Sequence, residues 1–92
     1  MPSSRKTRGV RHVYVTNSVS NNVSVIHRPG NTVVKAIPVG TTPVGVAVTP
    51  DGTHVYVANN NSDTISVIAR PGNTVVKTIP VGTGPVGVAI GP

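Results

Sequence analysis

The feature that most constrains the fold of this chain is an internal repeat. The segment RPGNTVVK occurs at 28–35 and again, unchanged, at 70–77. A shift of 42 residues aligns 12–50 with 54–92, and 28 of these 39 aligned positions are identical. Each repeat contains short segments rich in Val and Ile, separated by Gly, Pro and Asn, and neither shows helical periodicity. A period of this length with this pattern is typical of one β-propeller blade, which has four antiparallel strands.

The strands of one blade can be located in the second repeat. They are predicted at 43–48, at 54–59, at about 64–69 and at 74–81, with the first of these innermost. In the inner segment PVGVAV the valines share one face of the sheet, whereas Gly45 and Ala47 lie on the other. One face of the blade is therefore nearly flat, which allows a neighbouring blade to pack closely.

The order of the strands predicts the domain organisation. Residues 12–42 are expected to form a blade that lacks its inner strand, and 43–84 a full blade. Residues 85–92 are expected to supply the inner strand of a next blade, at 85–90. The predicted fold class is all-β, with about two 42-residue repeats of four-stranded antiparallel propeller blades in an incomplete ring.

Two kinds of tight turn are recognisable. The sequence PDGT at 50–53 is expected to join two strands, with Gly52 free to adopt a positive φ. The sequence RPGN, present in both repeats, is predicted to form a type II turn. In that turn Gly30 and Gly72 would occupy the third position and would have positive φ.

Composition limits both the core and the chemistry. The chain has no Trp and no Phe, so its core must be aliphatic, and its two aromatic residues, Tyr14 and Tyr56, are expected to pack within Val-rich strands. Cysteine is absent, which excludes disulfides and thiolate metal sites. No segment is long and apolar enough to span a membrane or to act as a secretory signal.

The net charge of +6 is concentrated at the N-terminus. Four of the eight basic residues, Arg5, Lys6, Arg8 and Arg11, lie in the first eleven positions. We predict that 1–11 is a disordered basic tail. Because these charges do not cluster on a folded face, nucleic acid is not expected as a partner.

The repeats resemble a known family. The segments VYVTN at 13–17 and VYVAN at 55–59, PVGVAVTPDGTHVYVANNNSDTISVI and NTVVKTIPVG resemble YVTN-family β-propeller repeats, over about residues 12–92. Members of that family normally have many more blades, and many are exported or displayed on prokaryotic cell surfaces, often with no assigned activity. The resemblance implies a surface-layer-like scaffold outside the cytoplasm, and a ring completed by other copies of the chain or by further blades.

The residues that commonly perform catalysis are few. The sequence contains no Glu, and its two acids, Asp51 and Asp63, fall in predicted turns. His12 and His54 occupy equivalent places before VYV, but a metal site usually needs three or more converging ligands. No catalytic, cofactor-binding or metal-binding residue is therefore predicted.

Two functions follow as alternatives. The first is a non-catalytic propeller segment that acts as a scaffold or as an interaction surface for a protein or a cell-surface ligand. Its interaction residues are predicted in the Asn-rich turns, at Asn17, Asn21, Asn22, Asn59, Asn60, Asn61 and Asp63. The alternative is part of a propeller enzyme, of the lactonase-like or quinoprotein-dehydrogenase-like type that the family resemblance suggests, whose site would line the channel of a completed ring.

Overall fold

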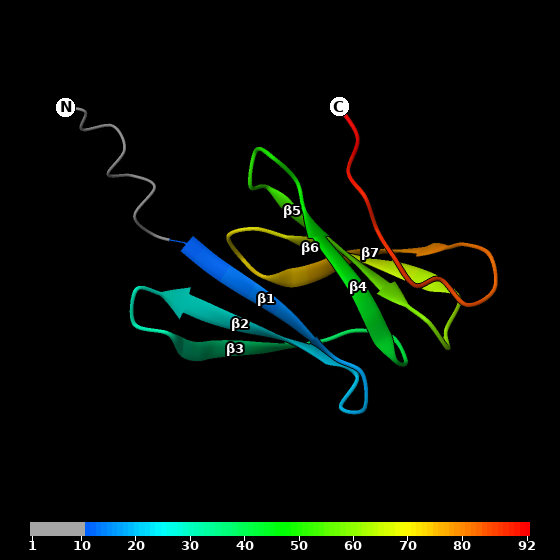
Figure 1. Ribbon diagram of the computed structural model, residues 1–92, viewed down its shortest axis with the longest axis horizontal. Helices are drawn as coiled ribbons and strands as arrows, with labels where there is room; N and C mark the ends of the chain where they lie inside the picture. The colour runs from blue at the N-terminus through cyan, green and yellow to red at the C-terminus, as the bar shows by residue number, and fades with distance from the viewer. Residues whose placement is uncertain (1–10) are drawn as a thin grey trace.

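The computed structural model describes residues 11–92, which form seven strands in two antiparallel sheets (Figure 1). The first blade consists of β1 (Arg11–Asn17), β2 (Asn22–Arg28) and β3 (Thr32–Pro38). The second blade consists of β4 (Pro43–Val48), β5 (His54–Asn59), β6 (Thr64–Ala69) and β7 (Thr74–Pro80). The all-β prediction is confirmed, and within the described residues no helix is long and apolar enough to cross a membrane.

The two repeats fold in the same way. Tyr14 of β1 lies opposite Val25 of β2, and the equivalent Tyr56 of β5 lies opposite Val67 of β6. The pairing with the outer strand also shifts register at the same place, directly after Val25 and directly after Val67. The repeat in the sequence therefore corresponds to the same strand register in both blades.

The structure differs from the prediction at the two ends of the chain, or does not describe the predicted segment. The tail predicted at 1–11 lies outside the described residues except for Arg11, which opens β1. Residues 85–90, predicted as a strand, form no ladder in the described chain. They instead pass across the flat face of β4, where a Cβ added to Gly45 would overlap the carbonyl oxygen of Val86. A strand is defined by pairing with a neighbour, and 85–90 lie over the face of β4 rather than beside its open edge.

The prediction of type II turns at RPGN is wrong. Gly30 and Gly72 do not have positive φ; the positive values belong to Asn31 and Asn73, both at 57°. The peptide bonds before Pro29 and Pro71 are cis. Asparagine tolerates the left-handed region better than most residues, so it can occupy this position in place of glycine. The prediction for the other turn is confirmed, since Gly52 has a φ of 74°.

The core lies between the two blades. Tyr14, Val23, Val25 and Ile37 of the first blade form one buried cluster with Val55, Val57 and Ile68 of the second. Apart from Tyr14, short β-branched side chains cover the facing surfaces, which lets the sheets approach closely. The fold is therefore held together by the contact of blade with blade, and the groups at the margin of that contact are the ones available for function.

Candidate functional site

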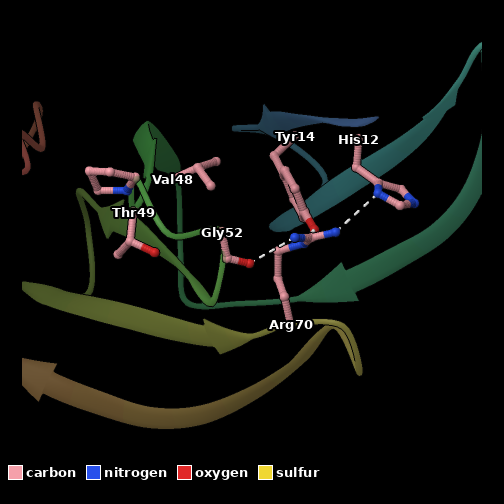
Figure 2. Close-up of a pocket in the computed structure, with 7 residues that line it drawn as sticks. His12, Tyr14, Val48, Thr49, Gly52 and Arg70 are labelled. Carbon is pink, nitrogen blue, oxygen red and sulfur yellow. Dashed lines mark hydrogen bonds between the residues drawn. The ribbon is translucent and has the colours of Figure 1, made fainter. Parts of the chain in front are cut away.

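A pocket of about 220 Å³ opens at the margin of the contact between the blades. It is lined by His12 and Tyr14 of β1, Val48 of β4, Thr49, Pro50 and Gly52 of the following turn, and Arg70 after β6 (Figure 2). We call it the inter-blade pocket. It gathers residues that lie more than fifty positions apart in the chain, since |i−j| is 56 for Arg70 and Tyr14.

Arg70 occupies the centre of the inter-blade pocket. Its Nε donates a hydrogen bond to the Tyr14 hydroxyl at 2.7 Å, and its Nη2 lies 3.1 Å from His12 Nδ1. Both of these partners belong to the first blade. Its Nη1 donates to the carbonyl oxygen of Gly52, in the second blade, at 2.7 Å. The guanidinium thereby joins the two sheets (Figure 2).

Tyr14 extends the same network. Its hydroxyl accepts from Arg70 and donates to Asn73 Oδ1 at 2.8 Å. The Arg70 guanidinium carbon lies 6.0 Å from the centre of the Tyr14 ring, at the limit of a cation–π contact. Tyr14 was predicted to pack in the core, and it is only 9% exposed.

The electrostatics of the pocket favour an anion. Neither of the two acidic residues of the chain lines it, so Arg70 is held by neutral acceptors. Within the described residues Arg70 uses three of the five N–H groups of a guanidinium. The remaining donors can bind a small anionic group such as a carboxylate. A guanidinium keeps its proton, so Arg70 itself binds charge and does not transfer protons.

His12 is held in its neutral form. Burial, the Arg70 guanidinium and the nearby His27, whose ring centre is 5.3 Å away, lower the pKa of His12 below its ordinary value of 6.5. A neutral ring can accept, at Nδ1, a hydrogen bond from Arg70 Nη2. A protonated ring could not, and it would place a second cation beside Arg70.

The stability of the protein should therefore fall as pH is lowered through this titration. Because the folded pKa of His12 lies below the unfolded value, the contribution is complete above about pH 6.5 and is lost as pH falls through the folded pKa. Urea denaturation between pH 8 and pH 5 should show this loss. His12→Gln, which keeps an acceptor without a titrating ring, should reduce the slope, and an unchanged slope would contradict this role for His12.

Asp51 lies in the turn beside the pocket. Its Oδ1 accepts from Thr49 Oγ1 at 2.7 Å, from Thr53 Oγ1 at 2.8 Å and from the Thr53 backbone N–H at 3.1 Å. These hydrogen bonds lower the pKa of Asp51 to about 2. A carboxylate with such a pKa is a weak base at neutral pH, so its role is to hold the turn that presents Gly52 to Arg70.

Asp63 and the equivalent Asn21 share another structural role. Asp63 Oδ1 accepts from the Gly84 N–H at 2.8 Å, and Asn21 Oδ1 accepts from the Thr42 N–H at 2.9 Å. Both residues have positive φ, at 57° and 60°. Each fixes the linker that leads from the outer strand of its blade to the next inner strand. The sequence signal for this role was an Asn or Asp at the same position of both repeats. The same residues are also common in exposed turns, so the signal did not distinguish the two.

The other predicted interaction residues differ in exposure. Asn59 is fully buried and donates to Thr64 Oγ1 and Ser66 Oγ, at 3.1 and 2.9 Å. Asn17, Asn22 and Asn60 are half-buried. Asn17 donates hydrogen bonds to Asn22 and Ser24, and Asn60 donates one to the Pro85 carbonyl oxygen. Asn21 and Asn61 are exposed. That these turns contact a partner stays a prediction.

A second hollow, of about 250 Å³, has no ionisable lining. Its walls are Pro38, Val39, Gly40, Ser66, Val75 and Thr78. Among residues 11–92 no group of three or more His, Cys, Asp or Glu side chains is placed to hold a metal ion. The inter-blade pocket is thus the better candidate for a binding site.

The chain matches a protein family and resembles solved structures. A family model described as YNCE-like beta-propeller matches residues 3–90. Among solved structures, the chain is similar to hydrazine synthase of Kuenenia stuttgartiensis, with a TM-score of 0.81 and 32% sequence identity. The similarity covers 83% of this chain and 22% of that one, so this chain spans about a fifth of the relative. A search of the curated proteins found no match.

Proposed function

Because the chain belongs to the YNCE-like β-propeller family, we propose that it is a non-catalytic propeller segment that serves as a scaffold and presents an interaction surface. The observation that supports this proposal is that Arg70 is engaged in hydrogen bonds between the blades. Its guanidinium is bound to His12 and Tyr14 of one blade and to Gly52 of the other. The groups most able to perform chemistry are thereby engaged in holding two blades together.

The interaction surface that we propose includes the inter-blade pocket. The guanidinium N–H groups of Arg70 that have no partner within 11–92 favour an anionic group of the binding partner, such as the carboxylate of a protein or of a surface glycan. By the resemblance to YVTN-family repeats, we propose that the partner is met outside the cytoplasm, at a cell surface.

A second candidate function is part of a propeller enzyme. It is favoured by one observation, the similarity to a chain that is named for an enzyme, hydrazine synthase. The inner strand β4 has the sequence PVGVAV, which carries no acid, base or metal ligand. An active site would therefore need side chains from further blades.

A substrate screen separates the two functions. The purified chain should show no turnover above a heat-denatured sample with lactone, ester, glycoside and phosphoester substrates, and its absorbance spectrum should show no retained cofactor. Turnover that co-purifies with the folded chain and is lost in His12→Gln, with an unchanged circular dichroism spectrum, would overturn the non-catalytic proposal. A cofactor retained through purification would favour the enzyme.

A further inference from the structure

The contact between the blades uses one face of each, and the repeat supplies the same two faces again. Within residues 11–92 no blade packs on these two faces, and 85–90 cross only the β4 part of the one on the second blade. On the second blade, the face turned to the first blade includes Val55 and Val57, each 0% exposed. The equivalent residues of the first blade are Val13 and Val15, which are 41% and 39% exposed. The same side chains are thus buried where a neighbouring blade is present and open where it is not.

The opposite faces show the same difference. On the first blade, Tyr14, Val23 and Ile37 are buried against the second blade. Their equivalents on the second blade, Tyr56, Ile65 and Ile79, are only half-buried. The free face of the second blade therefore matches, residue type for residue type or nearly so, a face that is known to pack on a blade of this sequence.

The polar contacts are repeated as well. Arg70 of the second blade binds Tyr14 and His12 of the first. Its equivalent, Arg28, is exposed, and Tyr56 and His54 stand on the free face of the second blade. Packing a first blade onto that face would bring the same three residue types together again.

The main chain supplies a third match. In the second blade β4 pairs with β5 so that Val46 lies opposite Val57. Among residues 11–92 the first blade has no strand in the position of β4, because β1 pairs only with β2. Residues 85–90 repeat the sequence of β4 almost unchanged and form no ladder in this chain. Shifted by one repeat, the observed register would place Val88 opposite Val15.

We propose that these surfaces form an interface between copies of this chain. The second blade of one copy packs on the first blade of the next, and 85–90 of the former completes the latter as its inner strand. Arg28 of the second copy then binds Tyr56 and His54 of the first, which creates a second inter-blade pocket that one chain cannot form. The contact is head-to-tail, so it can close into rings, and the usual range of about four to eight blades corresponds to two, three or four copies. This goes beyond the proposed function and holds whether the ring is a scaffold or an enzyme.

Two substitutions test the interface without touching the contacts of the single chain. Arg28 is exposed, and a Cβ at Gly87 would have no neighbour within 4 Å. In the assembly, Gly87 would take the place of Gly45, whose Cβ position is occupied by a carbonyl group. Arg28→Met and Gly87→Val should therefore leave the fold intact and weaken association. Gly91→Thr, which restores the residue that the first repeat has at Thr49, is the matched control.

Sedimentation velocity at micromolar concentrations measures the outcome. The unaltered chain and Gly91→Thr should form one discrete species of two, three or four copies. Arg28→Met should raise the dissociation constant by about tenfold or more, and Gly87→Val should give monomers, both with the circular dichroism spectrum of the unaltered chain. A monomer for the unaltered chain, or equal association of all four proteins, would overturn the interface. Polydisperse aggregates would also overturn it and would indicate that the free faces are met by further blades of a longer chain.

Discussion

Gly40→Ala should lower the free energy of unfolding by about 1–3 kcal/mol, the usual cost of adding an atom to a filled core. A Cβ at Gly40 would lie 2.7 Å from Asn59 Cγ and 2.9 Å from both Cβ and Nδ2 of the same side chain. Asn59 is fully buried and donates hydrogen bonds to Thr64 and Ser66. It cannot move away without leaving those groups unpaired, which adds to the cost.

Gly82→Ala is the matched control for that variant. Gly82 is the equivalent of Gly40 one repeat later, and a Cβ there would have no neighbour within 4 Å. At protein concentrations at which the chain is a monomer, this variant should keep the stability of the unaltered chain in urea denaturation. Equal losses for the two variants would show that Gly40 does not pack against Asn59 as described.

Arg70→Met should lower the free energy of unfolding by about 2 kcal/mol. The substitution keeps most of the apolar stem but removes the guanidinium, so the Tyr14 hydroxyl, the Gly52 carbonyl and the His12 ring each lose a hydrogen bond. A hydrogen bond from a charged group contributes roughly 1.5–3 kcal/mol, and partial access to water for the freed groups keeps the total near the lower part of that range.

The equivalent residue in the first blade provides the control. Arg28 is the last residue of β2, whereas Arg70 directly follows β6, and Arg28 is exposed. Arg28→Met should change the stability of the monomer by less than about 0.5 kcal/mol, as is usual for surface positions. If Arg28→Met were as destabilising as Arg70→Met, the position of Arg70 between the blades could not be the cause.

The sequence was sufficient to predict the blades because the same strand pattern occurs in both repeats. The predicted strands at 43–48, 54–59 and 64–69 coincide with β4, β5 and β6. The predicted end at 81 differs from β7 by one residue, since β7 ends at Pro80. Alternation of Val with small residues suffices to find such strands, because it follows directly from the two faces of a sheet.

Other features depend on contacts that the sequence does not display. The RPGN turns were predicted wrongly because Gly is the usual residue for positive φ, whereas here Asn31 and Asn73 adopt it. Asn59 was expected in an exposed turn, but it is buried because Ser66 on the next strand provides a partner for its side chain. An Asn at a strand end has the same appearance in the sequence in either situation.

The inter-blade pocket was not predicted at all. From the sequence, His12 was compared with a metal ligand and Tyr14 was expected in the core, while Arg70 was given no role beyond the RPGN turn. Their meeting depends on how one blade packs on the next. The available signal was that Arg, His and Tyr each recur at equivalent positions of both repeats, at Arg28, His54 and Tyr56.

A double-mutant cycle between Tyr14 and Arg70 tests the central claim, that this pair joins two propeller blades. Tyr14→Phe removes only the hydroxyl that accepts from Arg70 and donates to Asn73. Urea denaturation of the unaltered chain, Tyr14→Phe, Arg70→Met and the double variant gives the coupling free energy. Direct contact predicts a coupling of about 1 kcal/mol or more, and additivity within about 0.3–0.5 kcal/mol would contradict the packing of the two blades described above.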